Sequence, residues 1–316
     1  MKKYACLLLF AIMLNGCDDG DLVPEIIEFD EEKNPESCDT ETNELIYKLK
    51  PQEALILQLG ENTFSDVLGE KEISISDTGL PQLVYRTFDG VINRSNICDA
   101  IRPSAPNVSS ESKAVGGKIK ITTTANESDP APDGSTKING FKHSIYMSDI
   151  SYSIPGGGEQ VNPNFYFGVL TTSTYNSPLV SFTATNAKPC NQTQVFNYTG
   201  NTSMIIDALD PLLIQNIETS EPRKSTITAT QNQIVFNTYK TASITAAYFC
   251  QTPRPTAPEI DETWNAAANG EIEVVTTKSG TQYIHIITLK NVELSNTGGL
   301  KFKLPSSFIF GEITTQ

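Results

Sequence analysis

The sequence contains few histidines, tryptophans and basic residues. Its 316 residues include 2 His, 1 Trp and 23 Lys plus Arg against 37 Asp plus Glu, for a formal net charge of −14. This balance argues against nucleic-acid binding, because neutralising phosphates requires clustered Lys and Arg. No apolar run reaches the roughly 20 residues of a membrane-spanning helix. The abundance of Thr, Ser, Asn, Val and Ile is typical of an extracellular all-β protein.

The short motifs that identify common catalytic sites are also absent. The sequence has no G-x-S-x-G, H-E-x-x-H or G-x-x-x-x-G-K-[ST] segment. Geometry rather than sequence defines catalytic triads and glycosidase carboxylates, so a surface hydrolase with a carboxylate site stays open as an alternative. We expect no catalytic residue, no metal site and no cofactor, and hence a protein that is not an enzyme.

Residues 1–16 have the features of an export signal. Lys2 and Lys3 precede the apolar run Tyr4–Leu14, which is too short to span a membrane. The run ends in Leu14-Asn15-Gly16-Cys17, which resembles a bacterial lipobox. The resemblance implies cleavage before Cys17 and acylation of this cysteine. An ordinary signal peptide followed by an incidental cysteine is the alternative.

An acidic segment follows Cys17. Residues 18–36 contain nine acids and a single Lys. Such a stretch repels itself, so we expect an extended, solvated tether over residues 17–36. Acids directly after the cysteine also resemble the export signal of Bacteroidota lipoproteins. That resemblance implies an outer-membrane lipoprotein that faces the cell exterior.

The remaining chain contains one set of motifs twice. The spacing from Cys38 to Cys98 equals that from Cys190 to Cys250, at 60 residues. Further motifs recur in the same order, and together they predict an internal duplication with domains at 37–177 and 178–316. The recurring segments include 82–88 and 233–239, 102–106 and 254–258, 117–121 and 270–274, and 141–145 and 283–287. The first copy has 11 additional residues within 125–136.

The duplication selects a disulfide pairing. Four cysteines allow three connectivities, and an oxidising compartment permits bonds. An ancestral single module had only its own two cysteines to pair, so we expect Cys38–Cys98 and Cys190–Cys250. Four reduced, buried thiols are the alternative.

Each copy reads as a set of short strands separated by turn residues, which favours an all-β fold of two tandem β-sandwich-like domains. The Cys spacing is similar to that of immunoglobulin domains, but no Trp follows Cys38 or Cys190 at the expected interval. Ser203–Ile217 is the best helix candidate, limited by Pro211. The expected strands lie at 83–88, 118–123, 141–153, 164–171, 234–239, 271–277, 283–294 and 307–314.

A few side chains could bind a ligand or a metal. His143 and His285 occupy equivalent positions, but each shares a strand face with apolar residues, so we expect half-buried structural histidines. Arg102 and Arg254 are expected to pair with acids or carbonyls at a rim. The acids in 125–136 lack calcium-loop spacing, which favours a solvated surface loop. The tyrosines available for stacking on a sugar are Tyr146, Tyr152, Tyr166 and Tyr175.

The chain as a whole resembles the functionally uncharacterised tandem-repeat surface lipoproteins of Bacteroidota, notably of Flavobacteria. The lipobox, the acids after Cys17, and the V-Y-R-T-F-D-G and C-x3-R-P-[ST]-A-P motifs carry this resemblance. It implies location and architecture, and no catalytic residues. The expected function is a non-enzymatic binding or structural module. The expected partners are the membrane, through the lipid, and a glycan or a surface protein.

Overall fold

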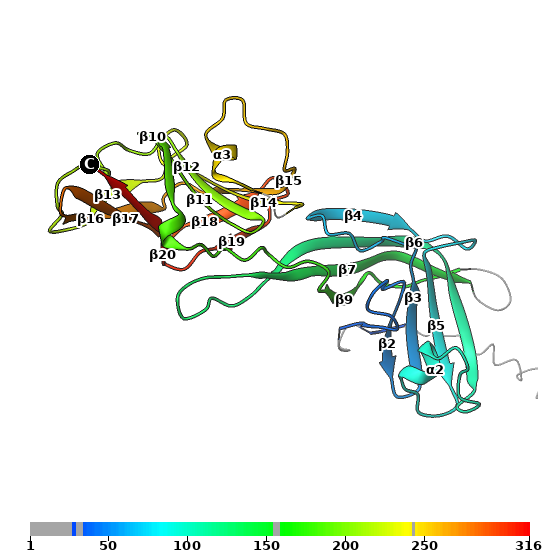
Figure 1. Ribbon diagram of the computed structural model, residues 1–316. Coiled ribbons are helices and arrows are strands. Elements are labelled where there is room, and N and C mark those ends of the chain that lie inside the picture. The colour runs from blue at the N-terminus through cyan, green and yellow to red at the C-terminus, as the bar shows by residue number, and fades with distance from the viewer. Residues whose placement is uncertain (1–26, 30–33, 154–158, 242–243) are drawn as a thin grey trace, which may run out of the picture.

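The computed structural model describes residues 27–29, 34–153, 159–241 and 244–316 (Figure 1). These residues form an all-β fold of several antiparallel sheets, which confirms the all-β part of the prediction. Two lobes are visible, and we call them the N-terminal module (up to residue 177) and the C-terminal module (from residue 178). Among the described residues, no helix is long and apolar enough to cross a membrane. Cys17 and the predicted export signal lie outside the described residues.

The N-terminal module is built on two very long strands, β6 (Val108–Glu127) and β7 (Ile138–Ser153). They pair with each other, and the pairing register shifts at Gly116. One end of β6 continues a sheet of order β1-β2-β3-β5-β6, while its other end pairs with β4; β8 and β9 pair with β7. The remaining strands are β1 (Glu36–Ser37), β2 (Leu45–Lys50), β3 (Glu53–Gln58), β4 (Gly69–Ser74), β5 (Gln82–Phe88), β8 (Glu159–Val161) and β9 (Phe165–Thr172).

The C-terminal module has the corresponding pairings in two separate sheets. The first has the order β10-β11-β12-β14-β15-β18-β19, and the second the order β13-β16-β17-β20. The strands of the first sheet are β10 (Lys188–Asn191), β11 (Gln194–Thr199), β12 (Thr202–Asp207), β14 (Gln233–Tyr239), β15 (Ile260–Ala266), β18 (Glu293–Asn296) and β19 (Lys301–Lys303). Those of the second are β13 (Arg223–Thr226), β16 (Glu271–Ser279), β17 (Gln282–Lys290) and β20 (Ser307–Thr315).

Each module carries one disulfide beside a short helix. Cys38 is bonded to Cys98 and Cys190 to Cys250, with a Cα–Cα distance of 5.2 Å in both, which is the pairing that the duplication predicts. The helices are α2 (Arg94–Cys98) and α3 (Ala246–Phe249). A small apolar cluster surrounds each disulfide and is separate from the main core of its module.

The helix expected over Ser203–Ile217 does not form. Its first part is β12, a central strand between β11 and β14. Residues 203–206 are buried on both faces of the sheet, and a short continuous apolar run of this kind does not distinguish a strand from a helix. The rest, from Ala208 to Ile217, is an irregular loop.

The prediction of a solvated tether over 17–36 is wrong at Ile27 and Phe29. Ile27 and Phe29 are buried in the core of the N-terminal module. Asn162 accepts a hydrogen bond from the backbone N–H of Ile27 at 3.2 Å and donates to its carbonyl at 2.8 Å. The apolar residues alternate with Glu28, so burying them leaves the carboxylate exposed.

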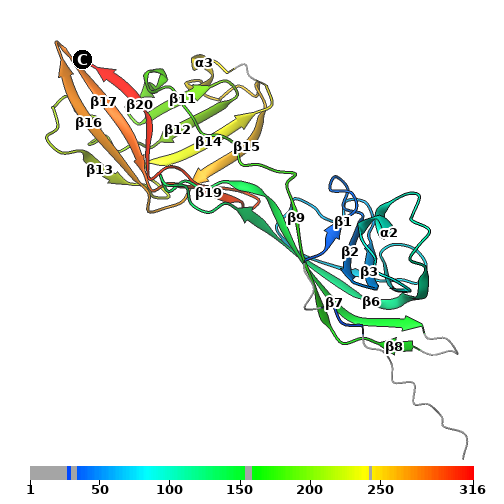
Figure 2. The same cartoon turned by 90° about the horizontal axis from the view of Figure 1, so that it is seen from below.

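The modules contact each other through the hairpin between β6 and β7, which reaches the C-terminal module (Figure 2). Ile138 and Phe141 are fully buried in the core of the C-terminal module, although they belong to β7. At the tip, the N–H of Thr136 donates to the carbonyl of Lys303 at 3.1 Å, and that of Ser306 donates to Asp133 at 2.8 Å. The loop that was expected to be a solvated surface loop therefore connects the two modules through hydrogen bonds.

Candidate functional site

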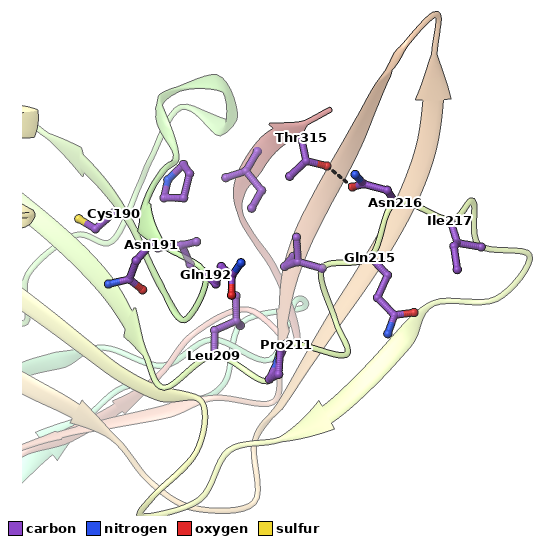
Figure 3. Close-up of a pocket in the computed structure, with 13 residues that line it drawn as sticks. Cys190, Asn191, Gln192, Leu209, Pro211, Gln215, Asn216, Ile217 and Thr315 are labelled. Atoms are coloured by element: carbon purple, nitrogen blue, oxygen red, sulfur yellow. Dashed lines mark hydrogen bonds between the residues drawn. The ribbon is translucent and has the colours of Figure 1, made fainter.

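The C-terminal module has a cavity of about 920 Å³ beside the end of β20 (Figure 3). The turn between β10 and β11 forms one wall, with Asn191 and Gln192, and the irregular loop 209–217 forms the other. Ile313 and Thr315 of β20 contribute the third side. The volume falls within the range of small-molecule sites.

The cavity is apolar at its base and carries amides at its edge. Val195, Leu209 and Ile313 are buried aliphatic residues at the base. Four carboxamide side chains, two from each wall, contribute hydrogen-bonding groups. None of the 13 lining residues is ionisable, since Cys190 is in a disulfide. Such a site suits an uncharged ligand.

A buried histidine supports the β20 side of this cavity. His285 is fully buried, and its Nδ1 and Nε2 lie 2.8 Å and 2.7 Å from the hydroxyls of Thr276 and Thr315. The hydroxyl of Thr315 in turn donates to the amide oxygen of Asn216 (Figure 3). Burial, with a smaller contribution from the charge of Arg223, lowers the pKa of His285. A neutral imidazole therefore fixes Thr315 in place.

The N-terminal module repeats this histidine arrangement. His143 is fully buried between the hydroxyls of Thr123 and Thr172, at 3.0 Å and 3.1 Å. Burial lowers its pKa to about 4, and the nearby carboxylate of Asp66 offsets part of this effect. Both histidines are thus structural bridges, as the strand pattern predicts, but they are more deeply buried than expected.

An acidic pocket of about 570 Å³ occupies the corresponding place in the N-terminal module. It lies between the β1–β2 turn and the β3–β4 loop, and Glu41, Glu44, Glu61 and Asp66 line it. All but Glu44 are exposed, and Asp66 accepts a hydrogen bond from the Thr174 hydroxyl at 2.8 Å. The two modules therefore place pockets of opposite character at matching positions.

The tyrosines singled out in the sequence do not converge on one site. Tyr146 and Tyr166 are cross-strand neighbours and about two-fifths exposed. Tyr152 lies in the core, where burial raises its pKa. Tyr175 donates a hydrogen bond to Glu262 of the other module, at 3.1 Å. Of these four tyrosines, only Tyr146 and Tyr166 are exposed.

The two arginines expected at a rim lie in different modules. Arg102 is exposed, and the guanidinium of Arg254 lies 3.9 Å from the carboxylate of Asp207. Sequence reasoning assigned none of the cavity residues to a ligand site, and Cys190 entered it only as a disulfide cysteine. The available signal was the apolar segment P-L-L-I-Q-N-I at 211–217, which is unusual for an exposed loop.

Comparison with protein-family models, with curated proteins and with solved structures found no match for the chain. No catalytic or ligand-binding residue can therefore be transferred from a relative. What the protein does has to be inferred from the cavity, from the sequence and from their chemistry.

Proposed function

We propose that the protein is a non-enzymatic binding module on the outer face of the outer membrane, and that the cavity of the C-terminal module is its ligand site. The observation that carries this proposal is the lining, which is aliphatic and amide-bearing and has no ionisable group. An uncharged ligand with both apolar and hydrogen-bonding parts complements it.

The anchoring part of the proposal rests on the lipobox and on the acids after Cys17. The roughly ten residues between Cys17 and the buried Ile27 span at most about 36 Å when fully extended. A lipid on Cys17 therefore holds the N-terminal module close to the membrane. The duplication supports a scaffold role, because the modules share strand order, disulfide spacing and buried histidines.

The alternative is a surface hydrolase, for which the acidic pocket of the N-terminal module is the candidate site. A glycosidase keeps one carboxylic acid protonated, usually by placing it in an apolar environment. Glu41, Glu61 and Asp66 are instead exposed to water. The binding role is therefore favoured over catalysis.

Two exposed residues of loop 209–217 provide the test. Ile217 and Leu212 are similarly exposed, at 63% and 64%, but only Ile217 lines the cavity. With the full chain in detergent-free nanodiscs and the uncharged dye Nile red as probe, we expect Ile217→Asp to weaken dye binding at least tenfold. Leu212→Asp should leave binding within twofold of the unmodified chain.

Equal effects of the two substitutions would contradict the proposed site. Hydrolysis of a neutral polysaccharide that is lost in Glu41→Gln or Glu61→Gln would instead favour the enzyme. In both cases the melting temperature of each variant must match that of the unmodified chain, because only then does the change report on the site.

A further inference from the structure

We infer that the ligand of the cavity is an extended, uncharged polypeptide segment that adds as a strand to the free edge of β20. This inference rests on the proposed function and names its ligand class. Binding by strand addition takes its affinity from backbone hydrogen bonds and its specificity from pockets for alternate side chains.

The backbone direction along β20 identifies the free edge. In the equivalent strand β9, the N–H of Val169 follows a register shift at Gly168 and donates at 3.0 Å to Asn34, outside the ladder with β7. Glu312 follows the same shift at Gly311, so its N–H points away from β17, the only strand paired with β20 in the described structure. Because backbone groups alternate in direction along a strand, those of Thr314 point the same way.

The edge of β20 is available for strand addition over a short stretch only. Outside the β17–β20 ladder, the backbone groups of Glu312 and Thr314 make no hydrogen bond to another described residue. Before this stretch, the carbonyl of Phe310 accepts a hydrogen bond from Asn197 at 2.7 Å, and η1 (Ala184–Asn186) and Ala187 pack against the face of the strand at Gly311. The free edge thus begins beyond Gly311.

The cavity lies where the side chains of an added strand would point. Ile313 and Thr315 alternate with the edge-facing residues, and their side chains line the cavity. Every second side chain of a strand beside β20 lies on that same face of the sheet. Aliphatic side chains at those positions would enter the apolar base formed by Val195 and Leu209.

The amides at the cavity edge suit a peptide backbone. A carboxamide both donates and accepts, as a peptide unit does. The side chains of Gln192 and Gln215 line the cavity and make no hydrogen bond to another described residue. No aromatic ring lines the cavity, so a sugar would have no stacking surface there, and no cation is present for an anionic ligand.

The test uses blocked, uncharged hexapeptides in which Val or Ile alternates with Asn, Ser or Thr, and the full chain in nanodiscs. We expect some of these peptides to displace Nile red from the cavity. N-methylation of the tightest binder should weaken it at least tenfold at alternate amides only. The intervening amides should tolerate the methyl group, because they point away from β20.

A proline substitution tests the protein side. Thr314→Pro removes the outward N–H, and proline is tolerated at an unpaired edge. We expect it to weaken peptide binding at least tenfold. Thr171→Pro is the matched control, because the N–H of Val169 donates outward to Asn34 at 3.0 Å and Thr171 has the same direction in β9.

The outcomes separate the two proposals. If Nile red binds and depends on Ile217, but no hexapeptide displaces it, the cavity is a site and the peptide inference is wrong. Displacement by a neutral oligosaccharide or a fatty alcohol alone leads to the same conclusion. If N-methylation has no alternating effect, or Thr314→Pro and Thr171→Pro behave alike, strand addition is wrong. If the dye does not bind the cavity, both proposals fail.

Discussion

Phe141→Ala should destabilise the C-terminal module, although Phe141 lies on a strand of the N-terminal one. Its side chain is fully buried in the same apolar cluster as Trp264 and Phe310. Truncating a buried Phe costs about 3–5 kcal/mol, from lost burial and from the cavity left behind. That is a large share of a domain's typical stability of about 5–15 kcal/mol.

Trp264 makes this effect measurable. It is the only tryptophan and is fully buried in the C-terminal module, so its fluorescence reports the unfolding of that module. With a urea m-value of about 2 kcal/mol/M, Phe141→Ala should lower the midpoint of the Trp264 transition by roughly 2 M. Phe167→Ala is the matched control, because Phe167 is equally buried but lies in the core of the N-terminal module alone.

The control should shift the Trp264 midpoint by less than half as much. An unchanged midpoint in Phe141→Ala, or equal shifts in both variants, would refute the claim that the hairpin completes the C-terminal core. The same contacts bear on the prediction that residues 37–177 and 178–316 fold separately. Cutting the chain there exposes Ile138 and Phe141, so fragment 37–177 should aggregate more readily than the whole chain.

Three further predictions concern pH, the disulfides and the anchor. Because the pKa of His143 is about 4 when folded and near 6.5 when unfolded, its neutral form stabilises the fold fully above pH 6.5, and this contribution is lost as the pH falls towards 4. Urea unfolding of the N-terminal module should show a loss of about 2 kcal/mol at pH 5 that His143→Gln removes, whereas the contribution of His285 to the C-terminal module remains. Cys98→Ala should lower the unfolding free energy of the N-terminal module by roughly 4 kcal/mol and leave the Trp264 transition almost unchanged. A comparable shift of the Trp264 transition would contradict the claim that each disulfide stabilises its own module. Mass spectrometry should find Cys17 acylated and residues 1–16 absent. The Cys17→Ala variant should no longer be found in the membrane fraction. An unmodified Cys17 would contradict the lipid anchor.

The strands and the disulfides could be predicted because local pattern and duplication specify them. Apolar and polar residues alternate along 141–147, and this period of two places His143 on the buried face of its strand. The pairing of Cys38 with Cys98 follows from the repeated spacing of 60. Neither argument requires knowledge of which distant segments meet in space.

The burial of Ile27, the hydrogen bonds between the modules and the cavity could not be predicted, because contacts between distant segments create them. The burial of Ile27 depends on Asn162, which is 135 residues away. The backbone of Thr136 is bonded to Lys303, which the polar composition of that loop does not reveal. Loop 209–217 becomes a wall only because β10 and β20 lie opposite it.

The most direct test of the central claim is methyl NMR of the full chain with labelled isoleucines, titrated with the uncharged hexapeptides. Ile214, Ile217 and Ile313 line the cavity, whereas Ile101 and Ile309 are exposed elsewhere. The account predicts saturable shifts for the three cavity methyl groups and none for the other two. Saturable shifts confined to methyl groups outside the cavity, or equal shifts of Ile101 and Ile309, would contradict it.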